Sequence, residues 1–205
     1  GQVPEQFVDT GVNATWLADA ANAAGVIPYL RPPQPRVYDE RTPFPDIEMY
    51  RALSQTLRWQ GFAGMYLAYF PWPFSEREYQ IFREAADPDA FSRRNKRYLL
   101  QPREPAFDQE QIKESEAAAN EPSRPGGFPN LSRRRQLPVP LEEGKTARFS
   151  IVVSDDVESA KADGEMRKPV LTIRFSFFCV EDEIEIRFNG VVLPIEKAEI
   201  TDERA

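Results

Sequence analysis

The chain has 205 residues, of which 41% are hydrophobic and 29% charged, a composition typical of one large or two small soluble globular domains. It contains no histidine and a single cysteine, Cys179. This excludes a Ser-His-Asp or Cys-His catalytic arrangement, a zinc site of His and Cys, and a disulfide within the chain.

Charge and hydropathy exclude further classes of partner. The net charge of -7 disfavours nucleic-acid binding, because phosphate neutralisation needs a basic surface. No apolar run approaches the roughly 20 residues that span a bilayer, so we expect no membrane partner.

Catalysis by this chain alone would need carboxylates, Tyr, Lys or a bound cofactor. No Gly-rich phosphate loop follows a strand, and we expect neither a cofactor nor a metal.

The first predicted elements are a helix and a strand. The sequence "NATWLADAANAAG" (13–25) predicts a helix with Asn13 as its N-cap and Gly25 at its end. The apolar run "VIPYL" (26–30) predicts a short strand. A proline-rich loop over residues 31–45 follows, too long for a simple turn.

The next two elements repeat the order of helix and strand. "DIEMYRALSQTLRWQG" (46–61) predicts a helix capped by Asp46 and ended by Gly61. "FAGMYLAYF" (62–70) is nearly continuous in apolar residues, which predicts a strand buried on both faces. One face of the predicted helix is apolar through Met49, Tyr50, Leu53 and Leu57.

A third helix is predicted over residues 75–87, where Ser75 and Glu78 have the spacing of a capping box. The order of elements is that of a β/α protein, in which a helix connects two parallel strands. Two parallel strands cannot bury both of their faces alone. We therefore interpret residues 1–100 as the last part of a larger α/β domain.

The composition changes after residue 100. Residues 101–136 are rich in Pro, Gly, Ser, Glu and Arg, which predicts a linker. From residue 137 to 205 the apolar residues alternate with polar ones, as in half-buried antiparallel strands. Asn189-Gly190 predicts a type I′ hairpin turn. The expected strands lie within 147–155, 169–177 and 182–194, and we predict a small β-sandwich.

Several of these motifs resemble a known family. "PDIEMYRALSQTLRWQGFAGMYLAYFPW" (45–72) resembles the end of the TIM barrel in bacterial proteins related to glycoside hydrolases, and "REAADPDAFSRRNKRY" (83–98) is similar to the segment that follows it. The tail, "PVLTIRFSF…DEIEIRFNGVVLP", resembles their accessory β-sandwich. The earlier strands of the barrel are missing, since a complete barrel needs about 250 residues.

The resemblance implies an α/β plus all-β fold: a partial TIM-barrel-like half (1–100), a linker (101–136) and a small antiparallel β-sandwich (137–205). It implies a carbohydrate ligand and a parent protein that hydrolyses glycosidic bonds, with this chain itself inactive. The rest of the barrel or another chain would complete the α/β half.

The chain begins with Gly1 and shows no targeting segment, so its localisation stays open. The resemblance is compatible with a secreted or periplasmic parent. The alternative, from another class, is a non-catalytic carbohydrate-binding or scaffolding module.

In a TIM barrel the active site lies at the carboxyl ends of the strands and in the loops that follow them. The loop after the strand at 26–30 carries Arg31, Asp39 and Glu40. The planar fork of Arg31 suits a substrate carboxylate or hydroxyl, and Asp39 or Glu40 can supply one of the two carboxyl groups that a glycosidase needs. The alternative is that these charges form ion pairs in an exposed loop.

Aromatic residues follow the second strand. Flat rings with a polar tip suit the mixed faces of a sugar. Tyr69 and Trp72 are the candidates for sugar binding, and Trp72 is held between two prolines. The alternative is that the rings pack the last helix onto the barrel, which we favour for Phe70 and Phe74.

Two groups of charges are interpreted as structural. Glu48 and Arg51 lie in the first turns of the helix at 46–61, where Glu48 opposes the helix dipole favourably. The basic runs at 93–97 and 133–135 flank acidic stretches. We interpret them as solvated or linker charge rather than as phosphate sites.

Overall fold

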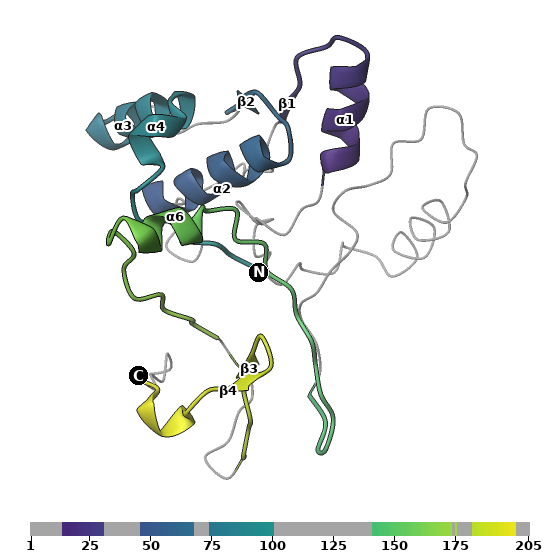
Figure 1. Cartoon of the computed structure of the whole chain (residues 1–205), viewed down its shortest axis with the longest axis vertical. Coiled ribbons are helices and arrows are strands. Elements are labelled where there is room, and N and C mark those ends of the chain that lie inside the picture. Colours follow the sequence, from purple (N-terminus) through teal and green to yellow (C-terminus); the bar gives the residue numbers. More distant parts are fainter. Residues whose placement is uncertain are drawn as a thin grey trace, which may run out of the picture. The chain divides into compact units, whose positions relative to one another are not determined.

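The computed structural model describes residues 14–30, 46–67, 74–100, 141–173, 175 and 182–199. The chain divides into two units, Gly1–Met166 and Arg167–Ala205, and each is described by itself (Figure 1). The first unit contains α1 (Thr15–Ala23), β1 (Tyr29–Leu30), α2 (Ile47–Trp59), β2 (Gly64–Met65), α3 (Glu76–Ala86), α4 (Pro88–Phe91) and α6 (Val157–Ala162). The second contains β3 (Arg187–Phe188), β4 (Val191–Val192) and a 3₁₀ turn, η1 (Ile195–Lys197).

Strands β1 and β2 form a parallel pair connected through α2. Tyr29 lies opposite Gly64, and Leu30 lies opposite Met65. The backbone N–H of Tyr66 donates to the Leu30 carbonyl at 2.9 Å, which extends the ladder by one residue. The predicted parallel pairing of the two strands is confirmed.

Helix α2 forms for the reasons that its sequence indicates. The Asp46 carboxylate accepts a hydrogen bond from the backbone N–H of Met49 at 2.9 Å, which satisfies a donor that the first turn leaves unpaired. Tyr50, Leu53 and Leu57 are buried on one face. The predicted cap and apolar face are therefore confirmed.

Helices α1 and α2 end in the same way. In α2 the backbone N–H of Phe62 donates to the Leu57 carbonyl and that of Gly61 to the Arg58 carbonyl, both at 2.9 Å, the two bonds of a Schellman motif. Gly61 has φ +93°, a left-handed conformation that side chains disfavour. Gly25 has φ +71° at the end of α1, so both predicted glycine ends are confirmed.

The start of α1 differs from the prediction by one residue. The structure places Ala14, rather than Asn13, at the N-cap, where no side chain caps the helix. The backbone N–H of Ala14 donates instead to the side-chain oxygen of Gln60 at 2.9 Å, a buried contact with the end of α2. Asn13 itself lies outside the described residues.

A hydrophobic core cluster of the first unit lies between α1, α2 and one face of the strand pair. Its buried residues are Ala14, Ala18, Leu53, Leu57 and Phe62. Leu30 and Met65 pack against them from the strands. The burial of this apolar surface is what holds two short strands and a crossover helix together.

Helix α3 begins with the predicted capping box. The Glu78 side chain accepts a hydrogen bond from the backbone N–H of Ser75 at 2.7 Å. The Ser75 hydroxyl in turn accepts one from the backbone N–H of Arg77 in the first turn. Hydrogen bonding to Ser75 holds the pKa of Glu78 below its ordinary value. The prediction of this capping box is confirmed.

The second unit contains the predicted hairpin. β3 and β4 are antiparallel, with Phe188 opposite Val191. The turn residues Asn189 and Gly190 have φ values of +49° and +84°, as a type I′ turn requires. Among the described residues, those of 147–155 and 169–173 have no sheet pairing. The β-sandwich and the TIM barrel stay predictions, as do the boundaries at residues 100 and 136.

Candidate functional site

The predicted site lies at the carboxyl edge of the strand pair. The segment that begins with Arg31 leaves directly after β1, and the aromatic segment follows β2. Because β1 and β2 are parallel and in register, both segments begin at the same edge of the pair. The five predicted binding residues themselves lie outside the described residues, and their roles stay predictions: Arg31, Asp39, Glu40, Tyr69 and Trp72.

Two tyrosines stand on the outer face of the strand pair at this edge. The side chains of a strand alternate between its faces, so Gly64 and Tyr66 share the face opposite to Met65. Tyr29 belongs to the same face, because it pairs with Gly64. Tyr29 and Tyr66 are each 63% exposed.

Gly64 makes room for one of these rings. A Cβ atom at position 64 would lie 3.2 Å from Cε1 and 3.4 Å from Cδ1 of Tyr29. The Tyr29 ring therefore lies against the bare backbone of Gly64. A Cβ at position 64 would require the ring to shift by a few tenths of an ångström.

The exposure of Tyr66 corrects one expectation. The apolar run from 62 onward predicts a strand buried on both faces, whose rings serve the fold, and that prediction is wrong for Tyr66. Among the described residues of the strand pair, Met65 and Leu30 pack against the core cluster. The signal that could have drawn attention to this face is the glycine two residues before Tyr66, because a glycine within a strand often marks a close approach of another group.

Phe74 is part of an aromatic cluster on α3. Its ring makes edge contacts with Tyr79, at a centroid distance of 6.0 Å, and with Phe82, at 5.3 Å. Such perpendicular pairs are favourable packing geometry. These contacts pack Phe74 against α3, and the packing of this helix onto a barrel stays a prediction.

Arg51 has the structural role that the sequence favoured. Its guanidinium holds Glu84 of α3 with two bonds, Nε to Oε2 at 2.5 Å and Nη2 to Oε1 at 3.0 Å, in a buried setting. Burial raises the pKa of Glu84, but hydrogen bonds from Arg51 and Gln80 more than offset it, and the pKa lies below its ordinary value. This pair fastens α3 to α2.

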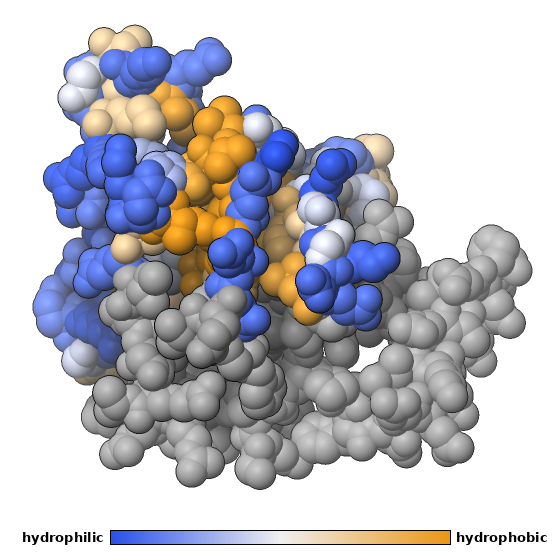
Figure 2. Space-filling view, turned by 90° about the horizontal axis from the view of Figure 1, so that it is seen from below, coloured by the Kyte–Doolittle hydropathy of each residue, from blue (hydrophilic) through white to orange (hydrophobic). Residues whose placement is uncertain are grey.

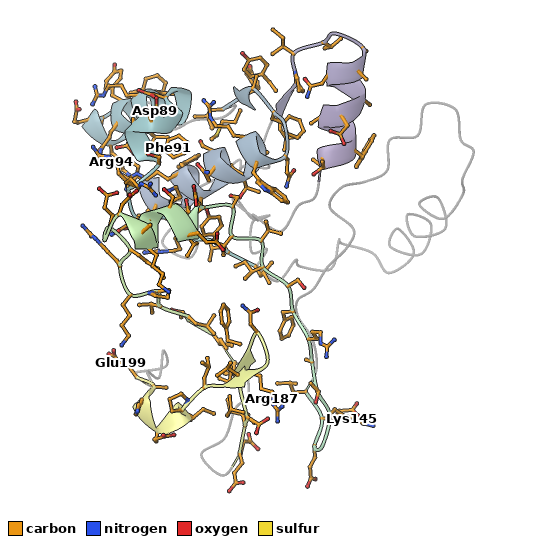
Figure 3. All side chains as sticks on the ribbon, in the orientation of Figure 1. Asp89, Phe91, Arg94, Lys145, Arg187 and Glu199 are labelled. Carbon is orange, nitrogen blue, oxygen red and sulfur yellow. The ribbon has the colours of Figure 1, made fainter. Side chains whose placement is uncertain are left out.

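The cations of the basic run, residues 93–97, form ion pairs with carboxylates. Each of its four cations lies within ion-pair distance of at least one acidic side chain. The partners are Asp163 and Glu165 for Arg93, Glu84 for Arg94, Asp155 for Lys96, and Asp46 and Glu48 for Arg97. The run is thus a set of internal ion pairs, and it is not available as a phosphate site. Figure 3 shows Arg94 beside Phe91, the buried last residue of α4.

A polar cluster surrounds Ser154, and the sequence gives no sign of it. The Ser154 hydroxyl lies 3.2 Å from that of Thr56 and 3.4 Å from that of Tyr98, and the Gln55 amide donates to the Ser154 carbonyl at 3.1 Å. Residues 56 and 154 are 98 positions apart, so no local pattern could reveal the contact.

This cluster is built for packing rather than for catalysis. Burial raises the pKa of Tyr98 far above its ordinary value, although the hydrogen bond with Ser154 acts in the opposite direction. Tyr98 therefore stays protonated and cannot act as a base towards Ser154. The nearby ammonium group of Lys96 is paired with Asp155 at 2.7 Å.

The described residues also contain no trio of Asp, Glu, His or Cys that could hold a metal ion. Cys179 lies outside them. Within the same residues, no helix combines the length and the apolar character that crossing a bilayer requires. The described part of the strand edge offers stacking and hydrogen-bonding groups in Tyr29 and Tyr66.

Comparison with known proteins does not assign the chain to a family. The chain matches no protein-family model, no curated protein and no solved structure. The resemblance to proteins related to glycoside hydrolases accordingly stays an expectation from short motifs.

Proposed function

We propose that this chain binds carbohydrate at the carboxyl edge of its parallel strand pair, as the C-terminal part of a glycoside-hydrolase-like TIM-barrel protein. The observation that carries this proposal is the pair of exposed tyrosine rings, Tyr29 and Tyr66, on the outer face of that edge. Ligands of parallel β/α proteins bind outside the carboxyl ends of the strands. The segments with the predicted binding residues begin at the same edge.

The chemistry of the two rings suits a sugar. A tyrosine ring offers an apolar face for the C–H side of a pyranose and a hydroxyl for its polar rim. Tyr69 and Trp72 would extend this platform, and Arg31 would bind a hydroxyl or carboxylate of the ligand. Ligand sites commonly combine such an apolar surface with a few polar groups.

The chain by itself is proposed to be inactive. Hydrolysis of a glycosidic bond needs two carboxyl groups about 5 to 9.5 Å apart. Asp39 or Glu40 would supply one of them in the parent protein. The second, and the other β/α units of a barrel of about 250 residues, would come from outside this chain.

The test is a titration with oligosaccharides that follows tryptophan fluorescence. The chain has three tryptophans, and two of them, Trp16 and Trp59, lie on helices α1 and α2. A Trp16→Phe/Trp59→Phe background leaves Trp72 as the single reporter. We expect a saturable change in its emission with a cello-, xylo- or manno-oligosaccharide.

Three tyrosine variants locate the site in that background. Tyr29→Ala and Tyr66→Ala should each weaken binding roughly tenfold or more, the effect of losing one stacked ring. Tyr79→Ala is the matched control, because Tyr79 is also an exposed tyrosine but lies on α3. Equal binding by all three variants, or no change in Trp72 emission at millimolar oligosaccharide, would contradict the proposal.

A second candidate function is that of an interaction module, and the second unit favours it. Large apolar residues are exposed there, with Val170 at 86% and Val191 at 66%. In Figure 2, which is coloured by hydropathy, apolar residues (orange) are exposed among polar ones (blue). Exposed apolar clusters mark protein-protein contacts. This function predicts a larger sedimenting species that Val170→Lys and Val191→Lys reduce, whereas carbohydrate binding should be unchanged by them.

A further inference from the structure

The acidic segment, residues 154–165, packs against the helices of residues 46–100, although residues 101–140 separate them in the sequence. It carries five carboxylates and one lysine, and it faces the basic run with its four cations. We propose that the acidic segment is a detachable ligand of the basic run, held within the same chain by charge and hydrogen bonds. The surface that it covers would accept a second acidic segment of the same sequence.

Arg93 makes the outer part of this contact. Its Nη2 donates to Asp163 at 2.8 Å and to the Ser159 hydroxyl at 2.7 Å, and its Nε lies 3.1 Å from Glu165. These groups lie on or just after α6, so the helix presents them together. The Arg93 side chain is 37% exposed, and salt reaches its ion pairs.

Lys96 makes the inner part. Its ammonium group lies 2.7 Å from Asp155 and donates to the Ser92 carbonyl at 2.9 Å, above the Phe91 ring. The Lys96 side chain is only 2% exposed. A charge held this deeply needs its counter-ion, so Asp155 anchors the segment more firmly than the outer pairs do.

Ser154 adds specificity that charge alone does not provide. Its hydroxyl meets the hydroxyls of Thr56 and Tyr98, and its carbonyl accepts from Gln55. These contacts fix which residue stands beside Lys96 and set the register of the segment. An acidic peptide with Ala in place of this serine should therefore bind less tightly.

The contact is polar rather than apolar. None of the residues of α6 is buried, and Val157, its large apolar residue, is exposed. Binding held by charges is weakened by salt, whereas apolar burial is not. Arg94 and Arg97 keep partners outside the acidic segment, in Glu84 and in Asp46 and Glu48. Detachment therefore frees Arg93 and Lys96 in particular.

The test begins with the full chain, into which a protease site is inserted within residues 101–136. After folding, the chain is cut there and passed over a gel-filtration column. We expect the two pieces to elute together at 0.05 M NaCl, with a dissociation constant that rises roughly tenfold at 0.5 M. A synthetic peptide of residues 150–166 should displace the C-terminal piece. Separation of the pieces at low salt would overturn the proposal.

Charge reversals identify the contact. Arg93→Glu should weaken the association of the pieces roughly tenfold or more, and Asp163→Arg with Glu165→Arg should restore it in part. Arg83→Glu is the matched control, because Arg83 pairs with Glu76 within α3 and does not touch the acidic segment. Equal effects of Arg93→Glu and Arg83→Glu would overturn the assignment.

A second measurement uses the uncut chain and does not depend on the fate of the pieces. Amide hydrogen exchange of residues 160–165 reports the docking of α6, whose backbone bonds a helix of six residues cannot maintain alone. We expect protection at low salt and its loss in Arg93→Glu but not in Arg83→Glu. Exchange that is equally fast in all three chains would show that α6 is not docked.

Discussion

At the scale of the residue, the first unit depends on charges that its helices bury. Arg51 and Glu84 lie on different helices and satisfy each other with two hydrogen bonds. A buried ion pair of this kind contributes little net stability over an apolar pair, but removal of one partner leaves an unpaired buried charge, which costs about 3–5 kcal/mol. The pair therefore specifies how α3 sits on α2.

The Glu84 carboxylate makes the fold less stable in acid. The pKa of Glu84 in the folded protein lies below the ordinary 4.5. In acid, this carboxylate therefore binds a proton more readily in the unfolded chain than in the folded protein. The stabilisation is present above about pH 4.5 and is lost as the pH falls through the lower pKa of the folded state. Glu78, whose pKa is also lowered, contributes with the same sign. Urea unfolding measured between pH 7 and pH 3 should show a falling free energy below pH 4.5.

Glu84→Gln separates this effect from general acid unfolding. The variant should lose about 3–5 kcal/mol at pH 7 and show a shallower decline below pH 4.5, because one titrating group is gone. Glu76→Gln serves as the control, since the Glu76 carboxylate is exposed and its ion pair with Arg83 contributes at most about 1 kcal/mol. An unchanged pH profile in Glu84→Gln would contradict the assignment.

At the scale of the element, the helices end at glycines whose conformations the backbone bonds require. Gly25 and Gly61 both occupy the left-handed position of a Schellman motif. They differ in their surroundings. A Cβ at Gly61 would lie 3.4 Å from the Cβ of Ala18 and 3.5 Å from Nδ2 of Asn22, whereas one at Gly25 would meet nothing within 4 Å.

The left-handed conformation that the two glycines share predicts similar costs for the same substitution. Gly25→Ala should cost about 1 kcal/mol of unfolding free energy, the conformational penalty alone. Gly61→Ala should cost a similar amount, because a Cβ there would lie at ordinary van der Waals distance from Ala18 and Asn22 and α1 need not move. Chemical denaturation of the two variants measures the difference. A clearly larger loss in Gly61→Ala would show that the space beside Ala18 and Asn22 does not admit a Cβ.

At the scale of the whole molecule, the first unit extends to residue 166. Residues 141–166 belong to it, although a stretch of linker composition precedes them. The reason lies in the partners of the acidic segment. Ser154 and Asp155 contact α2 and the residues after α4, and Arg93 binds the carboxylates around α6.

Truncation tests this extent. A chain of residues 1–166 should unfold with the same urea midpoint as the first unit in the full chain. A chain of residues 1–100 should be less stable by roughly 1–3 kcal/mol, because Arg93 and Lys96 lose charged hydrogen-bond partners. Equal midpoints for the two truncated chains would mean that residues 141–166 contribute nothing to the first unit.

Much of the local structure could be read from the sequence, because its causes are local. The Asp46 cap, the capping box at Ser75, the glycine ends of α1 and α2, and the Asn189-Gly190 turn depend on residues a few positions apart. The parallel pairing of β1 and β2 followed from a helix between two apolar runs. Of the candidate site, the sequence located the strand edge, and its five named residues stay predictions.

The tertiary structure alone decided which faces are covered and which charges meet. The alternation of a strand tells which residues share a face, but it cannot tell whether a partner covers that face, so Tyr66 was expected inside and lies outside. Likewise, the cations of residues 93–97 indicate only a charged segment. Their pairing with Asp155 and Asp163 depends on a chain return over some sixty residues, and no pattern within a short window of sequence contains that information.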